Sequence, residues 1–282
     1  MHRTSLKFFA ALALAATSAA CTQGNAKPAE TAAAPNVVTI TAADFNYQSP
    51  ATIPAGMTTI RLVNDGTELH HVQLVRLDDG HTVQELMAGM SGHDGPPPPW
   101  VHFVGGPNTP VPGGGVSEAT LDLKAGTYAM LCFIPSKDGV PHVAKGMVKP
   151  LTVVPAEGAA AAAPVADLDM NLADYSFATN TELRAGRRTI KVQNVAVQPH
   201  EVILVQLAPG KTMHDMMAWL MNENGPPPGR PVAGTTGLDR GEVNYITADF
   251  QPGEYALLCM LPDAKDGKPH IAHGMARQIT VR

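Results

Sequence analysis

Four residues of types that bind soft and borderline metals recur in the same order twice along this chain of 282 residues. The two sets are, in chain order, His70, Cys132, His142 and Met147, then His200, Cys259, His270 and Met275. One thiolate, two imidazoles and one thioether make up the ligand set of a blue-copper site, with a trigonal Cys and two His and a distant axial Met. The sequence therefore predicts two copper sites, one in each half of the chain.

The residues around these positions repeat as well. Residues 126–132 read GTYAMLC and residues 253–259 read GEYALLC. The loops that follow also match, because residues 138–142 read DGVPH and residues 266–270 read DGKPH. Self-similarity at a fixed offset is the mark of a duplicated unit, so we interpret the chain as a tandem repeat.

We expect two domains, at residues 37–154 and 166–282, each long enough for one sandwich core. Residues 155–165 are rich in Ala and Pro and have no apolar periodicity, which is typical of a linker. Within each domain an apolar period of two predicts short strands. In the first domain these strands are expected at 58–64, 70–77, 118–123, 127–133 and 151–154, with their counterparts between 188 and 281.

Helical spacing interrupts the strand pattern once in each domain, at Thr82 to Met90 and at Thr212 to Asn222. Gly-Pro-Pro-Pro follows each of these segments, which ends a helix and begins an irregular crossover. Short strands with one long crossover indicate an all-β fold of two tandem Greek-key β-sandwiches, each with a short helix and a Pro-rich crossover.

On these motifs the chain resembles the cupredoxin family, and the resemblance covers both domains. Gly-x-Tyr-x-x-x-Cys followed by His-x4-Met is similar to the plastocyanin-like C-terminal signature, and residues 199–202 (PHEV) resemble the strand that carries the first ligand. We choose His70 over His71 as that ligand because His70 aligns with His200 and precedes an inward alternation of apolar residues. The resemblance implies an electron carrier or copper-binding protein with one copper in each domain.

The chain departs from the copper enzymes of this family directly before each cysteine. The loops from Cys132 to His142 and from Cys259 to His270 are long and contain Pro, as in two-domain copper nitrite reductases. In those enzymes a His precedes the copper Cys, whereas Leu131 or its counterpart Leu258 stands there in this chain. The His-Cys-His motif of multicopper oxidases is missing too. We therefore expect no type 2 or trinuclear copper and no catalysis.

Simpler interpretations remain open for single residues. A Cys at the end of an apolar strand can be a small core residue, and the second domain could have kept its fold after losing its site. Cys132 and Cys259 could also pair with each other, although the repeated motifs around them argue against a disulfide. The position after the first ligand His, usually Asn in the family, is His71 or Glu201, which leaves the hydrogen bonding around the Cys sulfur undetermined.

The N-terminus predicts export. Arg3 and Lys7 precede an apolar run, and the small residues before Cys21 complete the pattern of a signal peptide at 1–20. Those small residues before a Cys resemble a bacterial lipobox, which implies lipidation of Cys21 and a tether at 21–36. The protein would then lie on the periplasmic face of a bacterial membrane, held by the lipid anchor only. An ordinary cleaved signal, leaving a soluble periplasmic or secreted protein, is the alternative.

Charge narrows the possible partners. A formal net charge of −5 without a cluster of Lys and Arg argues against nucleic acid as a partner.

Three hypotheses for the function follow from the motifs. The first is one-electron transfer with a redox protein of the cell envelope, with His142 and His270, on the exposed end of the sandwich, as the electron exits. The second is copper storage, delivery or detoxification with a copper-trafficking protein. The third is a metal-free envelope scaffold.

Overall fold

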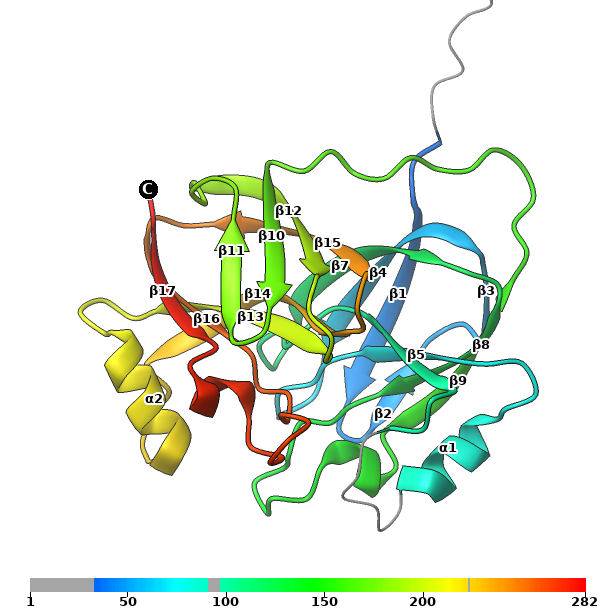
Figure 1. The fold of residues 1–282 in the computed structure, drawn as a ribbon, viewed down its shortest axis with the longest axis horizontal. Coiled ribbons are helices and arrows are strands. Elements are labelled where there is room, and N and C mark those ends of the chain that lie inside the picture. The colour runs from blue at the N-terminus through cyan, green and yellow to red at the C-terminus, as the bar shows by residue number, and fades with distance from the viewer. Residues whose placement is uncertain (1–32, 91–96, 223) are drawn as a thin grey trace, which may run out of the picture. The chain divides into compact units, whose positions relative to one another are not determined.

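The computed structural model of the chain describes residues 33–90, 97–222 and 224–282. These residues are built mainly from two β-sheets, shown in Figure 1. The predicted signal peptide, Cys21 and most of the predicted tether lie outside the described residues.

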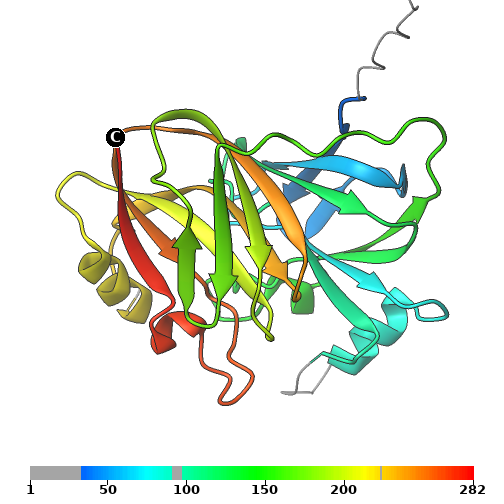
Figure 2. The ribbon, with the colours of Figure 1, turned by 45° about the horizontal axis from the view of Figure 1, so that its top comes forward.

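One sheet has eight strands, four from each half of the chain. In spatial order they are β11 (Ser176–Thr179), β10 (Leu168–Ala173), β12 (Gly186–Asn194), β15 (Val243–Phe250), β7 (Gly115–Leu123), β4 (Gly56–Asn64), β1 (Asn36–Ala43) and β2 (Asn46–Gln48). The sheet runs through both halves because β15 pairs antiparallel with β7. Figure 2 shows the four strands of the second half side by side.

The other sheet has nine strands. They are β17 (Ala276–Val281), β16 (Gly253–Leu258), β13 (His200–Leu207), β14 (Gly229–Leu238), β6 (Val101–Gly105), β5 (Gln73–Leu77), β8 (Gly126–Leu131), β9 (Val148–Val154) and β3 (Thr52–Pro54). This sheet also crosses from one half to the other, where β14 pairs antiparallel with β6.

Alternating burial along the strands places one core between the sheets in each half. In β4, Ile60 and Leu62 point inward and their neighbours are half-buried, as period-two patterning requires. The first core contains Cys132 and Met147, and the second contains Cys259 and Met275. The predicted all-β class with a sandwich in each half is confirmed, and the candidate ligands lie inside the sandwiches.

The two predicted helices are confirmed as α1 (Val83–Met90) and α2 (Met213–Asn222). Each packs its apolar side on the nine-stranded sheet, in clusters that contain Leu86 and Met216. Within the described part of the chain, no helix is long and apolar enough to cross a membrane.

Five strands of the first half lie where the periodicity predicts them, but not all boundaries agree. β5 begins at Gln73, so His70 and His71 precede the strand, whereas β13 already begins at His200. The sequence analysis did not predict strands β1, β2, β3, β6, β10, β11 and β14. Residues 155–165 contain neither helix nor strand. Cys132 and Cys259 are both free, so the disulfide alternative is wrong.

Candidate metal centre

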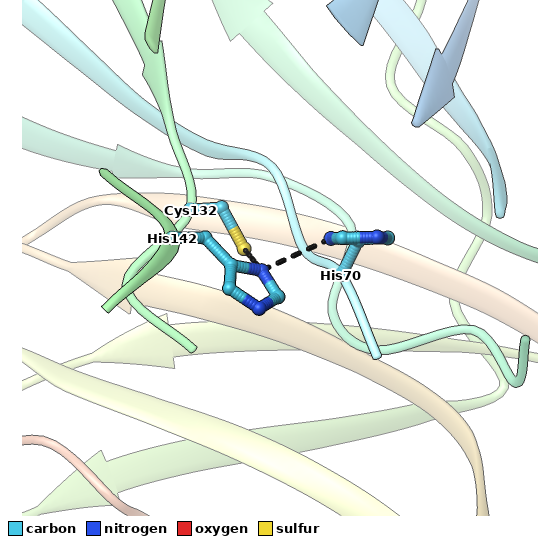
Figure 3. Close-up of side chains that lie close together, drawn as sticks. All are labelled: His70, Cys132 and His142. Atoms are coloured by element: carbon cyan, nitrogen blue, oxygen red, sulfur yellow. Dashed lines mark hydrogen bonds between the residues drawn. The ribbon is translucent and has the colours of Figure 1, made fainter. Parts of the chain in front are cut away.

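Three candidate ligands of the first half converge on one point, as Figure 3 shows. Cys132 directly follows β8, His142 opens a short 3-10 helix, and His70 stands in the segment before β5. The Nδ1 atoms of His70 and His142 are 3.1 Å apart, and the Cys132 Sγ atom is 3.4 Å from His142 Nδ1. All three side chains are buried. We call this group the first centre.

The second half repeats the group, which we call the second centre. His200 Nδ1 lies 3.0 Å from His270 Nδ1, and the Cys259 Sγ atom lies 3.2 Å from His270 Nδ1 and 3.9 Å from His200 Nδ1. These three side chains are also buried. In each centre the donor atoms lie within 4.8 Å of one another, close enough to share one metal ion.

Carboxylates set the tautomers of the first centre. His70 Nε2 is 3.2 Å from Asp44 Oδ1, and His142 Nε2 is 3.0 Å from Glu68 Oε2. An ionised carboxylate only accepts hydrogen bonds, so in each neutral ring the proton is on Nε2. Both Nδ1 atoms then present lone pairs to each other and to the thiol. Such outer hydrogen bonds orient imidazole ligands in metal sites.

The second centre differs at one of these positions. His200 Nε2 contacts Asp174 Oδ1 at 3.0 Å, as His70 contacts Asp44 in the first centre. His270 Nε2, however, is 3.8 Å from Asp263 Oδ2 and has no hydrogen-bond partner among the described residues. Gln198 stands where the first half has Glu68, which is the sequence difference behind this change.

A sharp turn returns the chain from each ligand His to the cysteine. The 3-10 helices His142–Lys145 and His270–His273 each end at a Gly with a left-handed φ, 97° at Gly146 and 94° at Gly274. The next residue is the candidate axial Met. Its carbonyl oxygen accepts a hydrogen bond from the cysteine N–H, at 3.3 Å for Met147 and 3.2 Å for its counterpart. Met147 and Met275 are therefore buried directly beside the cysteines.

The residue after the first His holds the backbone that follows the cysteine. His71 Nε2 accepts a hydrogen bond from Phe133 N–H at 2.9 Å, and Glu201 Oε1 accepts one from Met260 N–H at 3.0 Å. The Glu201 N–H also points at Cys259 Sγ, at 3.5 Å. The position left undetermined by the sequence is thus a fixed hydrogen-bond acceptor in both halves.

Burial governs the protonation of these groups. It raises the pKa of Cys132 to about 11 and raises that of Cys259 further. It also lowers the pKa of His70 and His200, and lowers that of His270 to about 4. At neutral pH the rings of His70, His200 and His270 are therefore neutral and both thiols are protonated, so a bound metal must displace the thiol proton.

Burial also shifts the pKa values of the two hydrogen-bond acceptors, His71 and Glu201. It lowers the pKa of His71 to about 3, although the neighbouring Asn108 side chain opposes this shift. It raises the pKa of Glu201 to about 7. In the first centre the Tyr47 hydroxyl favours the Cys132 thiolate, and Phe177 stands at the matching place in the second half.

An aromatic residue covers the outer His of each centre. The Phe45 ring meets the His142 ring edge-on at 5.1 Å, and the Tyr175 ring meets the His270 ring at 5.8 Å. Both covering residues have a left-handed backbone, with φ of 64° and 61°, a strained conformation that is common at functional sites. The expectation that His142 and His270 are exposed is wrong, because both side chains are fully buried, and their role as electron exits stays a prediction.

The sequence analysis missed the residues that hold and cover the imidazoles. Asp44 and Phe45 form the turn between β1 and β2, and Asp174 and Tyr175 form the equivalent turn between β10 and β11. The repeat contained the signal, because Ala-Asp precedes an aromatic residue at 43–45 and again 130 residues later.

The chain was compared with family models, curated proteins and solved structures. No family model and no curated protein matches the chain. An auracyanin from the photosynthetic bacterium Roseiflexus castenholzii aligns over 40% of this chain and 94% of its own, with 20% identity and a TM-score of 0.29. At this TM-score the alignment records a likeness only, and the sandwich in each half rests on the sheet topology of the chain itself.

Two other copper proteins, both longer than the auracyanin, align over most of this chain. A multicopper oxidase aligns over 87% of this chain and 88% of its own, with 16% identity and a TM-score of 0.24. A copper-containing nitrite reductase from Thermus scotoductus aligns over 88% of this chain and 68% of its own, with 14% identity and a TM-score of 0.25.

Proposed function

We propose that this is an exported copper-binding protein that holds one type 1 copper in each half and transfers single electrons in the cell envelope. The observation that carries the proposal is the pair of imidazole Nδ1 atoms facing each other at 3.1 Å in the first centre and 3.0 Å in the second. In the first centre both Nε2 protons are directed to carboxylates, so two lone pairs converge in a buried space. A cation relieves that repulsion.

The donor set selects which cation fits. A thiolate favours Cu(I) and zinc, imidazole suits Cu(II) and zinc, and a buried thioether beside the site is soft. These donors suit copper in both oxidation states, and copper bound there would supply a one-electron couple. The surrounding residues keep the donors in place: carboxylates orient the rings, and the turns at Gly146 and Gly274 hold His and Met on either side of the cysteine.

The closed surroundings favour electron transfer over catalysis. Every His and Cys of both groups is buried, and Phe45 and Tyr175 cover the outer rings. A catalytic metal needs an open position for its substrate, as catalytic zinc sites illustrate. An electron can pass through a covering ring without any ligand leaving. The same burial favours a resident metal over a cargo metal that is handed to a partner.

The remaining parts of the proposal concern location, organisation and partners. We propose export through residues 1–20, lipid attachment at Cys21, and sandwich domains at 37–154 and 166–282 joined by residues 155–165. We propose a redox protein of the envelope as the partner, and the net negative charge argues against nucleic acid. The His, Cys and Met side chains named above are the proposed ligands.

The test is a visible absorption spectrum of the Cu(II)-loaded protein together with the copper content of the same sample. We expect two coppers per chain and an intense thiolate-to-copper band. Cys132→Ser and Cys259→Ser should each remove one copper and part of the band, and the double variant should be colourless. Full colour in the double variant would contradict the proposal. Bound copper without the thiolate-to-copper band would favour storage, delivery or detoxification of copper. A protein that binds no copper would leave only the metal-free scaffold hypothesis.

A further inference from the structure

A buried polar chain runs between the two centres. At one end His71 accepts the N–H of Phe133, the residue after Cys132. At the other end Glu201 accepts the N–H of Met260, the residue after Cys259. Each end is therefore attached to the backbone that positions a cysteine ligand.

Asn108 joins these ends. Its Nδ2 atom donates to Glu201 Oε2 at 3.1 Å and lies 3.4 Å from the Thr235 carbonyl oxygen. Its side chain lies close enough to His71 to oppose the lowering of the pKa of that ring, and its buried Oδ1 has no hydrogen-bond partner among the described residues. Because His71 Nε2 already accepts a hydrogen bond, the ring proton is on Nδ1 and can satisfy that oxygen.

The halves of the chain meet at this residue. Asn108 belongs to the first half, between β6 and β7, and Glu201 belongs to β13 of the second half. The Asn108 N–H donates to the Gly234 carbonyl oxygen at 3.3 Å, which fixes the backbone across the boundary. Asn108, His71 and Glu201 are all buried, so water does not compete for these contacts.

The pseudo-symmetric position carries a different residue. Pro107 and Thr235 face each other in an antiparallel bridge, so Thr236 is the counterpart of Asn108. Thr236 Oγ1 lies 3.2 Å from the Val72 carbonyl oxygen and 3.4 Å from that of Gly106. Its hydroxyl binds backbone of the first half, whereas the amide of Asn108 connects two side chains that each hold a cysteine segment.

Resting on the proposed binding of copper at both centres, we propose that Asn108 is a positioning residue that couples them, so that metal at one centre changes the metal affinity of the other. Ligation fixes a cysteine and therefore the N–H of the next residue. In a close-packed interior that displacement is transmitted to the acceptor and along the chain of polar contacts. By linkage, the effect is the same in both directions.

The test compares Cu(I) affinities, measured by competition with a chelator, in four proteins. Wild type gives the product of the two stepwise binding constants, and Cys132→Ser and Cys259→Ser give the constant of each remaining centre. The ratio of the wild-type product to the product of the two single constants is the coupling factor. We expect it to differ from one by roughly fivefold or more. The double Cys→Ser variant gives the background.

When Asn108→Leu is added to each of these four proteins, the coupling factor should be one, because leucine is similar in shape to asparagine but its side chain makes no hydrogen bond. Thr236→Val is the matched control, since it removes a hydrogen bond at the same boundary and should leave the factor unchanged. The Cu(II) spectra give a second measurement. With coupling, the spectra of the two single-centre variants do not sum to that of wild type, and in the Asn108→Leu background they do.

The outcomes separate this inference from the proposed function. If wild type binds two coppers with full colour but its coupling factor is one, the centres are independent and the inference is wrong. A factor that persists in Asn108→Leu also overturns it. If wild type binds no copper, the proposed function itself fails. The comparison of wild type with the two Cys→Ser variants requires no change at Asn108, so it decides between coupled and independent centres even if Asn108→Leu does not fold.

Discussion

At His70 and His142, the partner of Nε2 determines what Nδ1 can do. A carboxylate at Nε2 fixes the proton there and leaves Nδ1 as a ligand, whereas a carbonyl at Nδ1 would have blocked it. Asp44 and Glu68 supply these carboxylates in the first centre. Single side chains outside the Cys, His and Met set therefore decide whether the imidazoles are ready to bind metal.

Asp44→Asn is expected to weaken copper binding at the first centre by roughly 10- to 100-fold, the usual cost of losing an outer-shell partner of a ligand His. The amide can turn its NH2 group to His70 Nε2 and so favour the tautomer with the proton on Nδ1. Competition with a chelator in the Cys259→Ser background measures this centre alone.

Two variants serve as controls for that result. Asp174→Asn in the Cys132→Ser background should weaken the second centre similarly, because Asp174 contacts His200 in the same way. Asp65→Asn changes an exposed carboxylate on the segment between β4 and β5 that carries His70, and it should leave the affinity as it is. An unchanged affinity in Asp44→Asn would show that this contact does not set the tautomer.

At the scale of elements, the turn between β1 and β2 does more than join strands. It supplies both the carboxylate at His70 and the ring over His142, and the turn between β10 and β11 does the same in the second half. Periodicity could not identify these turns because it reports which strand face is buried, whereas an Asp and an aromatic residue in a turn resemble any loop. Only the repeat at an offset of 130 residues distinguishes them.

The candidate ligands and the helices were predictable for a different reason. Cys, His and Met in a fixed order carry chemistry in their types, and α1 and α2 have apolar spacing that a strand cannot satisfy. The burial of His142 was not predictable, since it depends on Phe45, nearly 100 residues earlier. Distant side chains that cover a site leave no local pattern.

Both helices begin with a reciprocal cap that can be tested. The Glu85 N–H donates to Thr82 Oγ1 at 3.2 Å, and Glu85 Oε2 accepts the Thr82 N–H at 2.8 Å. Thr82→Ala should lower the free energy of unfolding by about 1 kcal/mol, measured by urea denaturation. Thr82→Ser keeps the hydroxyl and should stay close to wild type. An alanine variant as stable as wild type would mean that α1 does not need this cap.

The same cap predicts a pH dependence. Hydrogen bonds from Thr82 lower the pKa of Glu85 below its ordinary value of 4.5. A carboxyl group with a lowered pKa stabilises the folded state fully above its unfolded pKa, and that contribution is lost as the pH falls through the folded pKa. The stability difference between wild type and Glu85→Gln should therefore shrink on acidification below about pH 4.5. A difference that is constant from pH 7 to pH 3 would exclude the ionised cap.

For the whole molecule, continuity of both sheets makes the halves interdependent. At the boundary Asn244 accepts the Gly106 N–H at 3.0 Å and donates to the Val104 carbonyl oxygen at 2.9 Å. Gly105 makes room for it, because a Cβ atom there would lie 2.2 Å from Asn244 Oδ1. This buried amide of the second half thus completes the backbone hydrogen bonding of the first.

Asn244→Ala should destabilise both halves together. It leaves a buried N–H and a buried carbonyl oxygen without partners, which costs about 1–3 kcal/mol for each unsatisfied group. Trp100 lies beside α1 and Trp219 on α2, so Trp219→Phe and Trp100→Phe leave one fluorescent reporter in each half. In urea the two reporters should give the same midpoint, and Asn244→Ala should lower both equally.

The alternative is that each half unfolds on its own, as in a chain of independent domains. Asn222→Ala, an exposed Asn on α2, controls for the chemical change and should shift either midpoint by less than about 0.5 kcal/mol. If Asn244→Ala lowers only the Trp219 midpoint, the sheets do not transmit stability across β15 and β7. Coincident midpoints that move together would show that the halves fold as one unit, a rigid boundary that the proposed coupling through Asn108 requires.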